Sequence, residues 1–195
     1  MKKLFLGIAL VVFSALAQYH CPEAHFRVEP IDGGRSIQIT GYVGNNRTVR
    51  IPPTIRGLPV SHIGDRAFQQ KNLIYVTIPN SVIHIGNFAF EKNQLTSIVI
   101  PNGVTDINTR AFHDNQLTNV IIGNSVTIIR DGAFRNNQLT NITIPGNVSS
   151  IGFGVFRNNQ LTRVTIPGHT RFQNPTGRKN DATSAFDAGV VIARN

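Results

Sequence analysis

The 195-residue sequence predicts an α/β repeat solenoid made of 22-residue coils, each contributing one strand and one short helical turn. Two columns of apolar residues carry this prediction, because both recur at the same spacing of 22 residues. The leucine column is Leu73, Leu95, Leu117, Leu139 and Leu161, and the phenylalanine column is Phe68, Phe90, Phe112, Phe134 and Phe156. A fixed period in independent columns indicates coils that stack and share one core. The composition, 41% hydrophobic and 15% charged, fits a folded chain and not a disordered one.

The strand of each coil is predicted by the segment Leu-x-x-Ile-x-Ile. In one unit Ile98 and Ile100 alternate with Ser97 and Val99, so the two isoleucines point into the core and the other two side chains point outward. Pro101 follows and lacks an amide donor, which suits the end of a strand.

The helical turn is predicted by the segment at residues 64–68, where Asp65 is a candidate N-cap before Ala67 and Phe68. A further column before each leucine is Asn93, Asn115, Asn137 and Asn159. We expect these amides to bond to turn backbone and to neighbouring coils, which is a structural role.

The ends of the array depart from the period. Alternating apolar runs flank a turn at residues 32–34 and predict a β-hairpin that caps the first coil, within an N-terminal segment at 18–46. The array covers 47–167, and its first coil carries five extra residues around 52–57, expected to form a surface loop or a loop that binds a partner. Residues 168–195 form a divergent last coil with an insertion, where Val190–Ile192 is either a closing strand or an edge strand that pairs with another chain.

The first 17 residues are predicted to be a signal peptide, with a basic start, an apolar run and small residues at the end. A transmembrane segment is the alternative interpretation of this run. The protein is therefore expected to be exported, to the periplasm, the outer surface or the medium. Cys21 is the only cysteine, so no intramolecular disulfide is possible, and its thiol is either incidental or able to join two chains.

The unit Leu-Thr-x-Ile-x-Ile-Pro-x-x-Val-x-x-Ile-Gly-x-x-Ala-Phe-x-x-Asn resembles the BspA-like, Treponema pallidum-type class of bacterial leucine-rich repeats over residues 37–167. The resemblance implies a leucine-rich-repeat array in an exported or surface protein, often an adhesin or a binder of macromolecules, without shared catalytic residues. Two features depart from the family pattern: the unit is slightly shorter than the commoner one, and asparagine replaces the usual cysteine before the strand.

Specific catalytic motifs are absent, including dinucleotide and phosphate loops, the nucleophile elbow and the His-Glu-x-x-His zinc motif. The sequence therefore predicts no catalytic residue, no cofactor, no metal site and no enzymatic activity. Two weaker constellations remain as alternatives. One is a metal site at His20, Cys21, Glu23 and His25. The other is a metal or pH-sensing site on the stacked residues His62, His84 and Asp106, which are spaced by 22 residues.

The outward side chains of the strand ladder are the candidate binding surface. Tyr75, Val99 and Ile121 form a predicted apolar patch, since large apolar side chains facing water often mark an interface. Strand propensity alone is the alternative explanation for the two β-branched residues. The predicted surface is completed by polar side chains in the same two columns, namely Ser97, Asn119, Thr143 and Arg163.

The leading functional prediction is a protein-binding module, possibly an adhesin, that contacts a host or bacterial protein through this ladder face. A second prediction is a homo-oligomer that buries the same patch or the closing strand. A third is an anionic polysaccharide bound by basic residues near the ends, supported by a net charge that falls only from +9 to +7 on loss of Lys2 and Lys3. These basic residues are Arg47, Arg50, Arg56, Arg66, Arg171, Arg178 and Lys179. Nucleic acid is not an expected partner.

Overall fold

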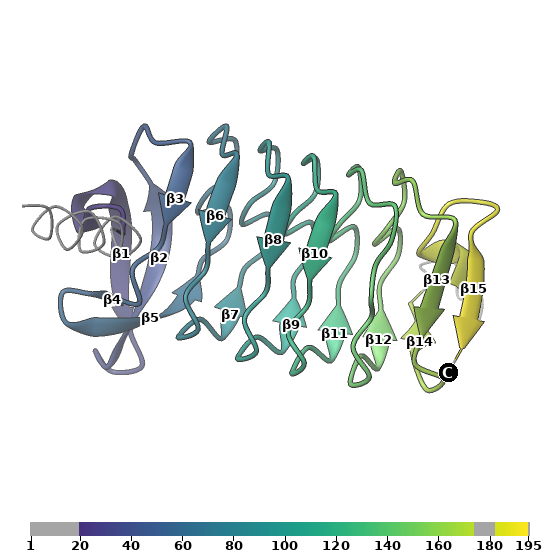
Figure 1. Cartoon of the computed structure of the whole chain (residues 1–195). Coiled ribbons are helices and arrows are strands. Elements are labelled where there is room, and N and C mark those ends of the chain that lie inside the picture. Colours follow the sequence, from purple (N-terminus) through teal and green to yellow (C-terminus); the bar gives the residue numbers. More distant parts are fainter. Residues whose placement is uncertain (1–19, 174–181, 195) are drawn as a thin grey trace, which may run out of the picture.

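The computed structural model describes residues 20–173 and 182–194, so the predicted signal peptide lies outside the described residues. The chain forms a solenoid whose coils stand side by side in sequence order from one end to the other (Figure 1). Each regular coil contributes strand segments to two separate sheets. Within the described ranges, no helix has the length and apolarity needed to cross a bilayer.

The predicted strand ladder is present and parallel. Its strands are β3 (Thr48–Arg50), β6 (Tyr75–Thr77), β8 (Ser97–Val99), β10 (Asn119–Ile121), β13 (Arg163–Ile166) and β15 (Val191–Arg194). They pair as β3 with β6, β8 with β10 and β13 with β15. The coil before β13 joins the ladder through a single parallel bridge between Thr143 and Thr165. The pairing is always between equivalent positions of neighbouring coils, so the outward columns run straight across the array.

A second sheet, which the sequence analysis did not predict, contains nine strands. The order is β1 (Phe26–Ile31), β2 (Ser36–Tyr42), β5 (Leu58–Ile63), β7 (His84–Ile85), β9 (Asp106–Ile107), β11 (Ile128–Ile129), β12 (Ser150–Ile151) and β14 (Arg171–Phe172), with β4 (Thr54–Ile55) pairing with β5. Most of these strands are only two residues long. They exist because stacked coils place equivalent extended residues, such as Ile85 and Ile107, in parallel register.

The predicted helical turn is wrong as a helix. Residues 65–70 and their equivalents form hydrogen-bonded turns, and the two short 3-10 helices that the described residues contain, η1 (Glu23–His25) and η2 (Ala182–Ser184), lie near the ends. Arg66 has φ 57° and Gln70 has φ 56°, in the left-handed region that ends a right-handed helix. The Phe68 amide donates to the carbonyl of Ala89 in the next coil, at 2.8 Å. The turn backbone thus bonds between coils instead of within one helix.

The core is a continuous stack of aromatic rings surrounded by Ile, Leu and Val. Successive ring centroids lie 4.9–5.7 Å apart in the series Phe68, Phe90, Phe112, Phe134, Phe156 and Phe186, with Tyr42 stacked 5.6 Å from the first. These side chains are fully buried. One column of phenylalanines therefore links all coils into a single packed unit.

The asparagine column has the predicted structural role. Asn115 accepts from the Leu95 amide at 3.1 Å, while its Nδ2 donates to the Phe90 carbonyl at 2.9 Å. Equivalent bonds recur one coil later at Asn137 and two coils later at Asn159. Each buried amide therefore satisfies backbone groups of the preceding coil, which those turns leave unpaired.

The N-terminal hairpin is also present, as β1 paired antiparallel with β2. Its strand β2 pairs in parallel with β5, and Phe26 packs near Phe68 with centroids 6.3 Å apart. The hairpin thus covers apolar surface at the start of the array. Cys21 is buried there, with its amide bonded to the Arg50 carbonyl at 2.9 Å. The expectation of an accessible thiol that joins two chains is therefore wrong.

Both insertions are placed differently by the structure. The extra residues of the first coil form a tight β4–β5 hairpin, turned by Arg56 and Gly57 at positive φ, and Ile55 is buried. At the other end, Phe186 takes its place in the aromatic stack and β15 pairs with β13. Val191 and Ile192 therefore belong to a closing strand, one of the two alternatives predicted for this segment.

Candidate functional site

The seven predicted binding residues lie together on the outward side of the ladder. Tyr75, Val99 and Ile121 are 42%, 56% and 54% exposed, which is high for large apolar side chains. Asn119, Thr143 and Arg163 are exposed as well, and Ser97 is half-buried. The strand faces are therefore as predicted, because the alternate residues Ile98 and Ile122 are buried.

Val99 and Ile121 are register partners on β8 and β10, so their side chains are direct neighbours. Tyr75 lies on β6, in the column of Ser97, one position before the column of Val99. Its hydroxyl accepts from Thr77 at 3.3 Å, so the ring leans along its strand toward the column that holds Val99. Val191 extends the Ser97 column at the C-terminal end, opposite Arg163, and is 51% exposed. Sequence reasoning treated Val191 only as part of a closing strand.

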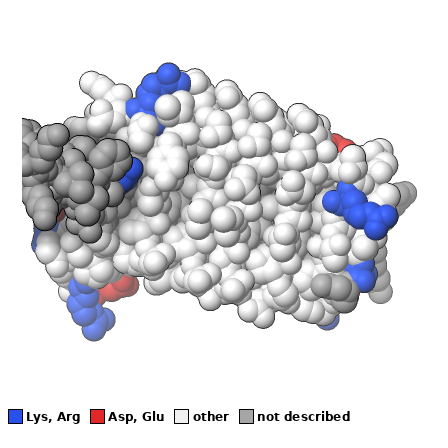
Figure 2. Space-filling view, in the orientation of Figure 1, with Lys and Arg blue, Asp and Glu red and all other residues white. Residues whose placement is uncertain are grey.

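The ladder face is uncharged over its central coils. No Asp, Glu, Lys or Arg occurs at residues 73–83, 95–105, 117–127 or 139–149, which hold the ladder strands and the loops after them. Figure 2 shows the same feature: in the view that presents β6, β8 and β10, basic side chains gather at the two ends and the middle is free of charge. A partner at this face must therefore be recognised through apolar contact and neutral hydrogen bonds.

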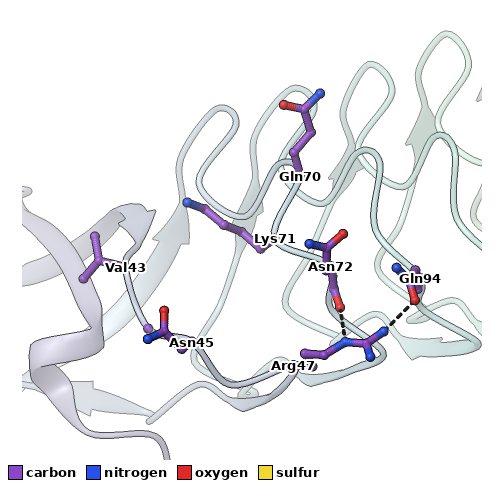
Figure 3. Close-up of a pocket in the computed structure, with 8 residues that line it drawn as sticks. Val43, Asn45, Arg47, Gln70, Lys71, Asn72 and Gln94 are labelled. Carbon is purple, nitrogen blue, oxygen red and sulfur yellow. Dashed lines mark hydrogen bonds between the residues drawn. The ribbon is translucent and has the colours of Figure 1, made fainter.

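A polar hollow of about 760 Å³ adjoins the ladder at its first coils (Figure 3). Its lining residues are Val43, Gly44, Asn45, Arg47, Gln70, Lys71, Asn72 and Gln94. Arg47 is fixed in the wall, since Nε donates to the Asn72 carbonyl at 3.0 Å and Nη2 donates to Gln94 Oε1 at 2.6 Å. Its carbonyl accepts from the Ile74 amide at 2.9 Å, which ties this wall to the start of β6.

The predicted stack of His62, His84 and Asp106 forms only in part. The two imidazole rings stack with centroids 5.2 Å apart, on the paired strands β5 and β7. Asp106 follows on β9 but pairs with Arg130, at 2.6 Å between Oδ1 and Nη2. Burial, and then the neighbouring His84, lowers the pKa of His62, while Asp32 opposes them. The stack is thus a pair of histidines without a shared carboxylate ligand.

The predicted N-terminal metal ligands are not gathered around one point. Cys21 is buried, and Glu23 Oε2 accepts from the Arg56 amide at 3.2 Å. Among the described residues, which include all four of these side chains, the group of three or more His, Cys, Asp and Glu that meets within reach of one ion is a different one.

That group is Glu91, His113 and Asp114, whose ligand atoms lie within 4.8 Å of one another. Sequence reasoning missed it, although Glu91 and His113 are 22 residues apart and so had to be neighbours. Burial is the main cause that lowers the pKa of His113, with Arg110 and Arg135 acting in the same direction and the two carboxylates acting against them. The His113 imidazole is accordingly neutral at neutral pH.

The basic residues predicted to hold a polyanion are placed in part. Arg56 and Arg171 are exposed at opposite ends of the array, and Arg66 covers the Phe88 ring at 4.8 Å. Arg178 and Lys179 lie outside the described residues.

A family model described as BspA type leucine rich repeat region matches residues 61–176, in six copies. The comparison with curated proteins found no match. Among solved structures, the chain is similar to a T. pallidum leucine-rich-repeat protein, at 26% identity and a TM-score of 0.50 over 80% of this chain and 64% of that one. It is also similar in fold to a leucine-rich-repeat protein from Eubacterium ventriosum, at 19% identity and a TM-score of 0.52 over 85% of this chain and 43% of that one. The chain thus spans less than two thirds of the length of either structure.

Proposed function

The chain belongs to the BspA-type leucine-rich-repeat family, and from this premise we propose that it is an exported module that binds a protein partner through the outward face of its strand ladder. Repeat arrays use such extended faces for binding because neighbouring coils present equivalent positions in straight columns. The partner is a host or bacterial surface protein, and an adhesin role follows from that choice.

One observation supports this proposal above the others. Val99 and Ile121 are adjacent, more than half exposed, and surrounded by uncharged polar side chains such as Asn119 and Thr143. An apolar centre with a neutral polar rim is the composition of protein-binding surfaces, whose cores lack charged residues. Tyr75 adds an aromatic side chain of the kind that dominates binding energy at such surfaces.

The test is a capture experiment with residues 18–195 immobilised on beads and exposed to extracellular-matrix and bacterial envelope extracts. Ile121→Asp places a charge at the centre of the patch, and we expect it to abolish capture of the proteins that the wild type retains. Ile83→Asp is the matched control, since Ile83 is 51% exposed but precedes β7 of the other sheet. Capture that is lost with Ile83→Asp and kept with Ile121→Asp assigns binding to the other side of the molecule.

Self-assembly through the same patch is distinguished by light scattering of the wild-type chain over a range of concentrations. A single monomeric species leaves the ladder face free for another protein. A stable oligomer that dissociates in Ile121→Asp shows instead that the partner is a second copy of this chain.

Binding of an anionic polysaccharide is a second candidate, favoured by the polar hollow beside the first coils. Arg47 and Lys71 bring two positive charges to its lining, together with the amides of Gln70 and Gln94 (Figure 3). Such binding weakens steeply as salt rises, because it depends on charge. Retention on a sulfated polysaccharide column that is unchanged between low and high salt counts against this candidate.

A further inference from the structure

The Glu91, His113 and Asp114 cluster joins two neighbouring coils of the array on the side away from the ladder strands. Glu91 comes from the turn after Phe90, whereas His113 and Asp114 come from the equivalent turn after Phe112. Nδ1 of His113 lies 3.2 Å from Glu91 Oε1 and 3.1 Å from Asp114 Oδ2. Three potential metal ligands therefore converge on one point between the coils.

The imidazole nitrogen at the centre of this cluster makes no hydrogen bond within the described parts of the chain. Nδ1 of His113 is buried, in a residue that is only 9% exposed, and two carboxylate oxygens face it. Buried polar atoms in proteins are almost always satisfied, so this one indicates a missing partner. A partner that attracts a nitrogen lone pair and two carboxylates together is a cation.

The second oxygen of each carboxylate is already held by an amide. Gln69 Nε2 donates to Glu91 Oε2, and Asn136 Nδ2 donates to Asp114 Oδ1 at 2.6 Å. These bonds leave Glu91 Oε1 and Asp114 Oδ2 directed at His113, which is how outer residues orient the ligands of a metal. Nε2 of His113 is 3.5 Å from Asn136 Nδ2, a contact too long to fix the ring proton.

We propose that Glu91, His113 and Asp114 form a zinc site that cross-links two coils of the solenoid. In a tetrahedral zinc site with bonds of about 2.0–2.1 Å, neighbouring ligand atoms are about 3.3 Å apart, close to the separations seen here. One imidazole and two carboxylates are a ligand set that zinc accepts, with water at the fourth position. Arg110 and Arg135 act against a positive ion and limit its affinity.

The test is zinc titration of the metal-free wild-type chain by calorimetry, with thermal melting as an independent readout. We expect one ion per chain and a higher melting temperature with zinc, because an ion held by two coils stabilises only the folded array. Glu91→Gln and Asp114→Asn keep the shape of the side chains, and each is expected to weaken zinc binding by at least about tenfold and to remove the thermal shift. Their circular dichroism without metal should match that of the wild type.

Two results overturn the proposal. One is zinc binding that persists in both carboxamide variants or is lost in His84→Gln, which removes an imidazole from the other histidine pair. The other is a cobalt-substituted chain with a thiolate charge-transfer band, which places the ion at Cys21 instead of at a nitrogen and oxygen site.

Discussion

Replacing Phe112 with alanine tests whether the aromatic stack holds the array together. The ring is 0% exposed and lies between Phe90 and Phe134, with centroids 5.3 and 5.5 Å away and planes inclined by only 5° and 6°. Removing a buried phenylalanine costs about 3–5 kcal/mol, depending on how far the surroundings collapse. Here the Phe112 amide donates to the Ala133 carbonyl at 2.9 Å, and the Phe90 amide donates to the Ala111 carbonyl at 2.8 Å. These bonds fix the spacing of the coils, so the cavity stays open and the loss falls in the upper half of that range.

Urea unfolding followed by circular dichroism measures this loss. The matched control is Phe153→Ala, because Phe153 is half-buried beside the array and its ring contacts the Arg157 guanidinium at 4.8 Å. Loss of such a contact costs about 1 kcal/mol. If Phe112→Ala costs no more than Phe153→Ala, the stack is not the source of stability that the structure indicates.

Three further perturbations test separate parts of the structure. Asn115→Ala unpairs a buried amide and a carbonyl of the preceding coil and should cost about 1–3 kcal/mol in urea unfolding, whereas Gln116→Ala, at an exposed position, should cost almost nothing. Because the lowered pKa of His62 means that the unfolded chain takes up the proton first as pH falls below about 6.5, stability is lost toward acid. His62→Gln should therefore lose less melting temperature than the wild type between about pH 7.5 and pH 5.5, and equal losses contradict this assignment. Ile122→Asp should unfold the chain by burying an unpaired charge, while the circular dichroism of Ile121→Asp stays native; the reverse outcome means that the strand faces are exchanged.

The solenoid, its period and the outward ladder positions could be predicted because stacking repeats the same environment in every coil. A column such as Phe90 and Phe112 reports burial twice over, once through its chemistry and once through its spacing. The short helical turn could not be predicted from local capping signals around Asp65. In the structure Asp65 Oδ1 accepts from the Asn87 amide of the next coil at 2.7 Å, so the residue caps a neighbouring turn and not a helix of its own.

The second sheet was hidden for a related reason. Pairs such as His84 and Ile85 are too short for alternation to distinguish a strand from a turn. Their pairing depends on the coil beside them, which only the stacked geometry supplies. The same geometry explains the unequal outcome at the histidines: the 22-residue spacing brought His62 beside His84, but the ion pair of Asp106 with Arg130 depends on side-chain directions that spacing does not report.

The claim that the ladder face binds a protein is tested most directly by hydroxyl-radical footprinting of the wild-type chain with and without its captured partner. Tyr75 is exposed and reactive in the free chain, and the account predicts that its oxidation falls sharply in the complex. Phe88, half-buried in a turn beside Arg66 and Arg110, should be oxidised equally in both states. Protection of Phe88 with unchanged oxidation of Tyr75 would contradict the account and place the partner on the turn side of the solenoid.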